Sequence, residues 1–188
     1  MVRASRLHRE GREFESLSAY HFFEIMDKHT ISALVENKFG VLARVSGMLS
    51  GRGFNIETLN VAPTENPAIS RITATIIADE ESLNRCIRQL DRLDNVITVQ
   101  NYDGVNCVAR ELVLVRVRAD DETRTNIIGL AEIFRAQVVD VAFDCLVLEF
   151  TGNANKTKAF LTLMEKFDII ELIRTGTLNL ERGMLVAK

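Results

Sequence analysis

The chain has 188 residues, of which 47% are hydrophobic and 26% are charged, and its formal net charge is −3. This composition predicts a globular protein of one or two domains. The weakly acidic balance argues against nonspecific nucleic-acid binding, which needs concentrated Lys and Arg, and no stretch approaches the ~18 apolar residues of a membrane span. We therefore expect neither a nucleic-acid partner nor a membrane partner.

Residues 1–28 are predicted to be an N-terminal extension that is disordered or weakly helical. Acidic and basic residues are equally frequent in it, whereas a transit peptide is poor in acids. Its most apolar stretch, residues 17–26, is interrupted by His21 and Glu24, unlike the core of a secretory signal. These features predict a cytoplasmic protein.

The first folded unit begins with a strand that leads into a helix. Within residues 30–36, the apolar Ile31, Ala33 and Val35 stand at every second position, the period-2 pattern of a half-buried strand. Residues 36–40 break this alternation, and apolar side chains then recur every three or four positions over residues 41–49, which predicts a helix. Gly51-Arg52-Gly53 predicts a left-handed glycine that ends the helix.

The remainder of this unit predicts the order βαββαβ. Its expected elements are a strand at residues 56–62, a loop at 64–68, a strand at 70–77, a helix capped by Asp79, and a strand at 96–100. Acidic residues in the first turn of that helix complement its dipole, and its apolar stripe is Leu83, Cys86, Ile87 and Leu90. The stripe predicts which face of the helix packs on the sheet.

After a connector at residues 102–106 the same order is repeated. The expected elements are strands at 112–118, 138–142 and 145–150, helices capped by Asp120 or Asp121 and by Asn153, and a final strand or pair of short strands within 169–180. The sequence thus predicts an α+β fold of two ferredoxin-like βαββαβ domains, each a four-stranded antiparallel sheet with two helices on one face. The other face, or an edge, remains for a partner. We place the domains at residues 29–103 and 109–184, with a linker at 104–108.

A candidate binding site for a small amino acid lies where the first helix begins. Backbone N–H groups of residues 40–42 would hold a carboxylate, and the amide oxygens of Asn37 and Asn55 would accept from an ammonium group. The candidate effector residues are Asn37, Gly40, Val41, Leu42, Asn55 and Ile56, the last bounding a side-chain pocket. On spacing alone, an ordinary turn at Asn37 and Gly40 and a strand start at Asn55 remain an alternative.

The sequence offers no catalytic or metal-binding constellation. The histidines lie in or beside the extension, without a second ligand at metal spacing; they are His8, His21 and His29. The cysteines are widely spaced and are expected to be reduced thiols; they are Cys86, Cys107 and Cys145. The central strands lack the aromatic side chains that stack RNA bases. We expect no catalytic residue, no metal and no cofactor in this chain.

Several motifs in order resemble the regulatory small subunit of acetolactate (acetohydroxyacid) synthase, whose first domain is an ACT domain. In the first unit these are Glu-Asn-Lys-Phe-Gly-Val-Leu-Ala-Arg-Val at 36–45, Arg-Gly-Phe-Asn-Ile-Glu-Thr-Leu at 52–59, Val-Ala-Pro-Thr at 61–64 and Ser-Arg at 70–71. In the second unit they are residues 110–112, 132–135, 139–141, 174–176 and 182–183. The resemblance spans roughly residues 30–183.

The resemblance implies a chain that is not catalytic itself. It would bind the large subunit, which uses thiamine diphosphate, magnesium and FAD in branched-chain amino acid biosynthesis, raise its activity and transmit feedback inhibition, usually by valine. ACT domains pair as a homodimer, with the effector between the first loop and helix of one copy and the second strand of its mate. Phe39 departs from the family, where this position is often proline or a small residue, and the extension is not a general family feature.

Two other functions remain at this point. A stand-alone ACT-type amino-acid sensor acting on another enzyme or on a transcription factor would share the effector site but not the large subunit. An enzyme in its own right would need a catalytic constellation that the sequence does not offer. The absence of a copurifying large subunit would favour the stand-alone sensor. Acetolactate formation by the purified chain alone would favour the enzyme.

Overall fold

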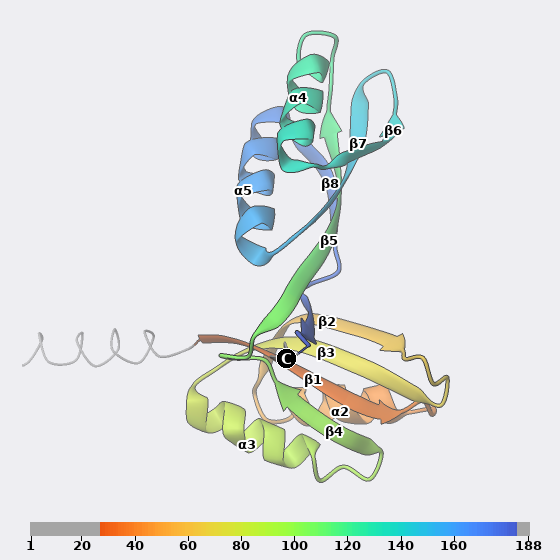
Figure 1. The fold of residues 1–188 in the computed structure, drawn as a ribbon, viewed down its shortest axis with the longest axis vertical. Coiled ribbons are helices and arrows are strands. Elements are labelled where there is room, and N and C mark those ends of the chain that lie inside the picture. The colour runs from red at the N-terminus through yellow and green to blue at the C-terminus, as the bar shows by residue number, and fades with distance from the viewer. Residues whose placement is uncertain (1–26, 184–188) are drawn as a thin grey trace, which may run out of the picture.

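The structure is a computed structural model that describes residues 27–183 (Figure 1). The predicted extension at residues 1–28 therefore lies outside the described residues, except for Asp27 and Lys28, which belong to the first strand. That strand begins three residues before the predicted start, because Asp27, Lys28 and His29 all continue the ladder with the neighbouring strand. No helix within residues 27–183 is long and apolar enough to cross a membrane.

The first unit has the predicted order βαββαβ. Its elements are β1 (Asp27–Glu36), α2 (Val41–Ser50), β2 (Asn55–Pro63), β3 (Ile69–Ala78), α3 (Glu80–Leu90) and β4 (Val96–Asn101). The four strands form one antiparallel sheet in the order β2-β3-β1-β4, so β2 and β4 are its edges. Proline at the end of β2 suits an edge position, since proline cannot donate to a ladder.

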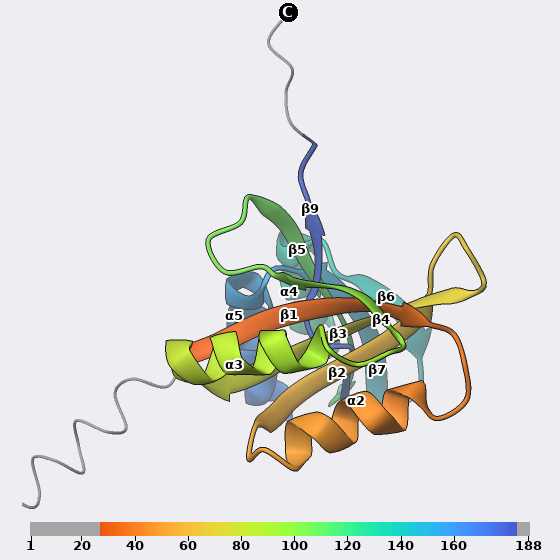
Figure 2. The same cartoon turned by 90° about the horizontal axis from the view of Figure 1, so that it is seen from below.

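Both helices of the first unit cover the same face of its sheet (Figure 2). Alternate residues of β1 and β3 point to this face and are buried, as the period-2 pattern predicted. Helix α2 contacts β2, and α3 contacts β4, so each helix covers one half of the sheet. Buried helix residues complete this core; they are Val41, Val45, Leu49, Leu83, Cys86 and Leu90.

The helix ends agree with the predicted signals in all but one detail. The Asp79 carboxylate accepts from the Ser82 N–H (2.8 Å) and caps α3 as predicted. At the end of α2, Gly51 keeps a right-handed conformation (φ −66°), and the left-handed residue is Gly53 (φ +79°). One further turn thus separates the helix from the reversal that leads into β2.

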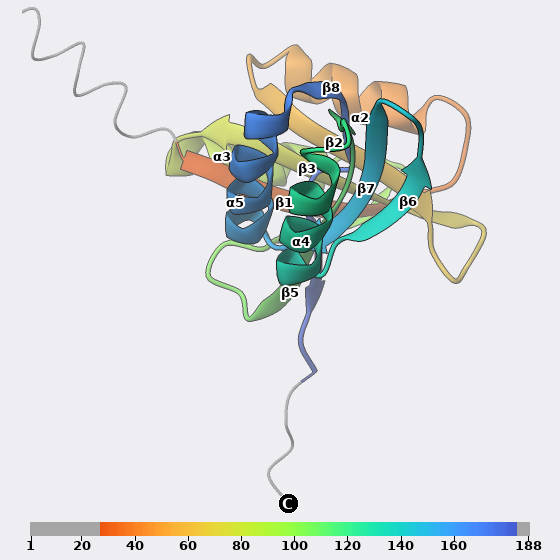
Figure 3. The same cartoon turned by 90° about the horizontal axis from the view of Figure 1, so that it is seen from above.

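The second unit repeats the order but adds a strand. Its elements are β5 (Cys107–Arg118), α4 (Arg124–Phe134), β6 (Gln137–Val141), β7 (Cys145–Gly152), α5 (Ala154–Met164), the 3₁₀ turn η1 (Glu165–Phe167), β8 (Ile169–Arg174) and β9 (Leu178–Glu181). The main sheet has the order β6-β7-β5-β8, and α4 and α5 lie on one of its faces (Figure 3).

Strand β5 is longer than the sequence predicted. It begins at Cys107 instead of residue 112, because residues 107–110 pair with β9 before the strand enters the main sheet. The final segment is accordingly a pair of short strands, β8 in the main sheet and β9 beside the start of β5. The predicted four-stranded sheet is therefore extended by a fifth strand that pairs with β5 alone.

The core of the second unit is built around aromatic side chains. Phe150 of β7 and Phe160 of α5 are stacked with ring centroids 4.7 Å apart, and Phe134 of α4 lies 5.5 Å from Phe160. Asn153 caps α5 as predicted, since its side chain accepts from the Lys156 N–H (2.9 Å). Asp120 does not cap α4 itself, because its Oδ1 accepts from the Glu122 and Thr123 N–H groups of a preceding turn and α4 begins only after Thr123.

The second unit lies against the open face of the first sheet. Figure 1 shows β9 and the start of β5 above the face that α2 and α3 leave free. Polar residues on this face, Ser32, Thr73 and Thr75, are buried, and Gln100 of β4 donates to Glu181 of β9 (3.2 Å). The expectation that this face stays available to a partner is therefore wrong for the first unit, and its edge β2 is the surface to consider.

Replacement of Phe160 by alanine should destabilise the chain, because it removes a fully buried ring from the centre of an aromatic cluster. We expect Phe160→Ala to lower the free energy of unfolding by about 3–5 kcal/mol in chemical denaturation. Phe143→Ala is the matched control, since Phe143 is fully exposed in the turn between β6 and β7, and should change it by less than about 0.5 kcal/mol. Equal effects would contradict the packing described.

Candidate functional site

The loop between β1 and α2 is held to the opposite loop of the sheet by Asn37. The Asn37 N–H donates to the Ala68 carbonyl (2.7 Å), and its Nδ2 donates to the Pro67 carbonyl (2.9 Å). Both acceptors belong to the loop that joins β2 to β3. No hydrogen bond to the Asn37 Oδ1 is formed within residues 27–183, so this oxygen remains an acceptor for a ligand.

A second set of contacts fixes the start of the same loop. Glu36 accepts from the Asn95 Nδ2 (2.5 Å) and from the Lys38 Nζ (3.0 Å), and Arg44 of α2 donates to the Asn95 Oδ1 (2.8 Å). The hydrogen bond from Asn95, followed by that from Lys38, lowers the pKa of Glu36. Sequence reasoning missed Asn95, because it lies 59 positions beyond Glu36 and has no local pattern of its own.

Gly40 gives the loop the backbone conformation from which α2 starts. Its φ is +79°, in the left-handed region that glycine adopts without strain, and a Cβ here would meet no atom within 4 Å. The conformation, and not lack of space, requires glycine. Because the position is open, a larger side chain would project into the space in front of the helix.

The N-terminal turn of α2 presents unused donors. Within residues 27–183 the N–H groups of Gly40, Leu42 and Ala43 have no backbone acceptor. Val41 differs from the prediction, because its N–H makes a long bond to the Lys38 carbonyl (3.4 Å) and its side chain is buried in the core. The arrangement can hold a carboxylate or a similar small anion through main-chain donors without burying a protein charge.

The structure does not bring Asn55 and Ile56 to this place within one chain. Glu36, just before the loop, pairs with Ile69 at the start of β3, whereas Asn55 pairs with Ile77 near its end. Eight residues of extended strand correspond to about 26 Å. One chain therefore places the candidate residues at opposite ends of the first sheet, as two candidate half-sites: Asn37, Gly40 and Leu42 at one, Asn55 and Ile56 at the other.

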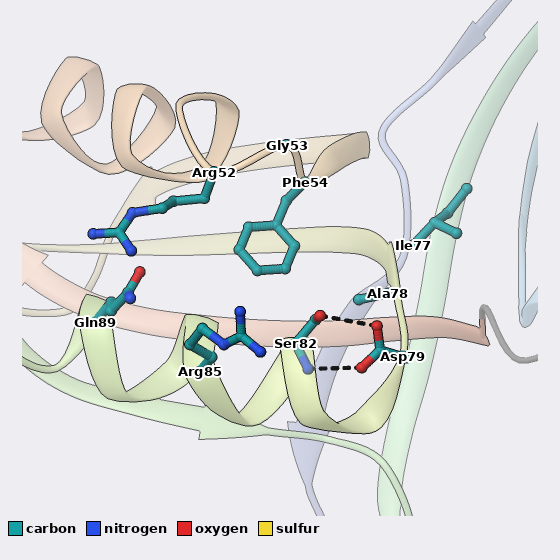
Figure 4. A pocket seen from close by; sticks show the side chains of 9 residues that line it. All are labelled: Arg52, Gly53, Phe54, Ile77, Ala78, Asp79, Ser82, Arg85 and Gln89. Carbon is teal, nitrogen blue, oxygen red and sulfur yellow. Dashed lines mark hydrogen bonds between the residues drawn. The ribbon is translucent and has the colours of Figure 1, made fainter.

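A hollow of about 150 Å³ adjoins the second half-site (Figure 4). It lies between the end of α2 and α3, with the Phe54 ring beside it, and the guanidinium groups of Arg52, in the turn after α2, and of Arg85, on α3, point into it. The Asp79 carboxylate in its wall is satisfied by the N–H and hydroxyl of Ser82, which lower the pKa of Asp79. None of the predicted effector residues lines this hollow.

The described residues contain no group of three or more His, Cys, Asp or Glu side chains that could hold a metal ion. His29 has a structural place, with its Nδ1 2.6 Å from Asp103 and its Nε2 2.9 Å from the Ala78 carbonyl. These contacts tie β1 to the end of β3 and to the connector between the units. His8 and His21 lie outside the described residues.

The three cysteines should differ in reactivity. Burial raises the pKa of the Cys86 thiol to about 11, while Cys107 and Cys145 are partly exposed. Because the thiolate is the reactive form, we expect two thiols of the native chain to react with a disulfide reagent at pH 8 and the third only after unfolding. Simultaneous reaction of all three would contradict the burial of Cys86, and Cys86→Ser is the control that identifies the slow thiol.

The chain consists of two ferredoxin-like units in tandem. In the first unit, backbone N–H groups without a backbone acceptor in the described part of the chain lie at the start of α2, directly after Gly40. Together these features are typical of a protein of the ACT type. The family described as the AHAS small subunit-like ACT domain matches residues 31–98, and the family described as the small subunit of acetolactate synthase matches residues 110–183. The chain belongs to the family of acetolactate synthase small subunits, as the motifs indicated.

Individual relatives agree with this assignment. A probable acetolactate synthase small subunit from Archaeoglobus fulgidus is 46% identical over 156 residues, which cover 83% of this chain and 98% of that protein. The small subunit from Mycolicibacterium smegmatis is 44% identical over 155 residues, or 82% of this chain and 91% of the relative. The crystal structure of the small subunit from Thermotoga maritima has a TM-score of 0.77 at 33% identity and covers 85% of this chain and 99% of its own.

Proposed function

We propose that this chain is the non-catalytic regulatory subunit that activates the large, thiamine-diphosphate-dependent subunit of acetolactate synthase and makes it sensitive to valine. Thiamine diphosphate, magnesium and FAD would belong to the large subunit, in a cytoplasmic complex. The observation that carries the effector role is the set of unused N–H donors at Gly40 and Leu42 beside the free oxygen of Asn37. Residues 29–103 would bind effector and dimerise.

A homodimer through β2 would complete the effector site. As an edge strand, β2 has unpaired backbone groups on its outer side, and Leu59 and Val61 on it are 38% and 40% exposed. Antiparallel pairing of two copies about Leu59, the midpoint of β2, would set Asn55 of the mate opposite Pro63. Because Pro63 lies beside Ser70, at the same end of the sheet as Asn37, the two half-sites would meet there.

The completed site would match both charged ends of a free amino acid. The donors of the α2 start would bind the carboxylate, and the amide oxygens of Asn37 and the mate's Asn55 would accept from the ammonium. Leu42, 42% exposed, and Ile56 would bound the aliphatic side chain. Phe39 is fully exposed beside Gly40 and would close one side of the pocket, which favours a small side chain such as that of valine.

The size of the ligand sets the strength of binding. Valine has about eight heavy atoms, and roughly 0.5–1 kcal/mol per atom gives a Kd between about micromolar and millimolar. One additional methylene changes binding by about 1–3 kcal/mol, so leucine and isoleucine should act weakly. Inhibition also requires that valine bind one conformation of the complex better than another, since equal affinity would shift no equilibrium.

Gly40→Asp should abolish valine inhibition while activation of the large subunit persists. The new carboxylate would project into the open space in front of α2 and repel the carboxylate of the ligand. The measurement is acetolactate formation by the mixed subunits, with valine titrated from zero. Gly104→Asp is the matched control, because Gly104 also has a positive φ (+69°) and open space around it but lies in the connector. Undiminished inhibition of the Gly40→Asp complex would refute the site.

A mixing experiment tests whether each effector site is shared between two chains. Gly40→Asp and Asn55→Ala should each abolish valine binding to the homodimer. A mixed dimer of these variants would have one doubly altered site and one intact site, so random exchange of chains should restore about a quarter of the sites. Calorimetric titration with valine measures this recovery. No recovery after verified chain exchange would contradict a shared site.

A further inference from the structure

Glu57 lies at an irregularity in β2 directly after the second effector half-site. The pairing of β2 with β3 shifts register between Ile56 and Thr58, so Glu57 is the extra residue of a β-bulge. A bulge bends its strand and redirects the side chain at that position. A change in the backbone at Asn55 and Ile56 would consequently alter the position of the adjacent Glu57 side chain.

The Glu57 carboxylate faces cationic groups from two directions. The Lys28 Nζ of β1 donates to it at 2.5 Å within the first unit. On the other side, Glu57 lines a cleft of about 350 Å³ together with Arg174, at the end of β8 in the second unit. The pKa of Arg174 is raised, mainly by its hydrogen bonds to Glu111 and to a lesser degree by the charge of Glu57, as expected for a guanidinium group near two carboxylates.

Arg174 forms a bidentate ion pair within the second unit. Its Nε and Nη2 donate to the two oxygens of Glu111 (2.8 and 3.0 Å), and Glu111 is only 2% exposed. The next residue, Thr175, accepts from the Leu112 N–H through its hydroxyl (3.1 Å). Because Glu111 and Leu112 both belong to β5, a displacement of the second unit would carry this segment with it.

The same segment touches the bulge through its backbone. Gly176 has a φ of +76°, and a Cβ at this position would lie 2.5 Å from the Thr58 Cβ. Such a distance admits no side chain at residue 176. The two units therefore meet at a close contact between Thr58 and Gly176, with the charges of Glu57 and Arg174 next to it.

We infer that Glu57 and Arg174 are the positioning residues through which the effector site on β2 controls the placement of the second unit, with the Thr58–Gly176 contact as pivot. The inference rests on the proposed function. An effector held at Asn55 and Ile56 fixes the bulge in one conformation. The position of Glu57 then selects the placement of Arg174, and Glu111 transmits that placement to β5. Effector binding and inhibition are thus separable at Glu57.

The primary test compares valine binding with valine inhibition in Glu57→Gln. Calorimetry on the small subunit gives the Kd for valine, and acetolactate formation by the assembled complex gives the concentration for half-maximal inhibition. We expect the Kd to change less than about two-fold and the half-maximal concentration to rise at least about five-fold, the lower range of an allosteric coupling. Glu57→Asp should restore part of the inhibition, and Glu65→Gln, in the exposed loop after β2, is the matched control.

The outcomes separate this inference from the proposed function. If the unaltered complex is not inhibited by valine, the proposed function fails. If it is inhibited and Glu57→Gln behaves identically, the positioning role is refuted. If the Kd and the half-maximal concentration rise together, Glu57 belongs to the binding site and the positioning role is again refuted.

A second pair of variants tests the pivot. Gly176→Ala and Gly104→Ala impose the same penalty of a positive φ, but only the former places a methyl group against Thr58. We expect Gly176→Ala to raise the half-maximal valine concentration at least about five-fold and Gly104→Ala to leave it within about two-fold. Equal values for the two variants would refute the pivot.

Discussion

The pairing of β3 with both β1 and β2 determines where every residue of the candidate effector site lies. Glu36 is fixed at one end of β3 and Asn55 at the other by main-chain hydrogen bonds. A ladder of this kind cannot slide by one residue without turning the buried side chains to the opposite face. The candidate half-sites are therefore kept apart within a chain, and the proposed antiparallel pairing with a second chain would unite them.

The same sheet explains how a site can be both neutral and specific. In the proposed site, main-chain donors and carboxamide groups would recognise the charged ends of a ligand without an uncompensated protein charge to bury. The charged residues next to the candidate site are paired with one another: Glu36 with Lys38 in the loop, and Glu57 of β2 with Lys28 of β1. Under the proposal, ligand binding by dipoles and control through the Glu57 ion pair would thus use different residues of the first unit.

The fold could be predicted because its signals are local. Alternation in β1 and β3, the cap at Asp79 and the glycine before α2 each act within a few residues. The sequence did not reveal Asn95, the bulge at Glu57 or the early start of β5, because each depends on a partner strand or loop far along the chain. The candidate site residues were predicted from the helix start and from the motifs, but their separation within one chain follows only from the register of the sheet.

Strand β5 has two sets of neighbours along its length, β9 for residues 107–110 and the main sheet beyond them. The join between the units is therefore a hydrogen-bonded ribbon closed by the C-terminal strand, and not a loose tether. A fragment that ends before Leu178 would leave the backbone N–H and C=O groups at the start of β5 without the partners that β9 provides. Such an unpaired strand edge promotes aggregation between chains. The pairing of β9 with the start of β5 thus opposes separation of the two units.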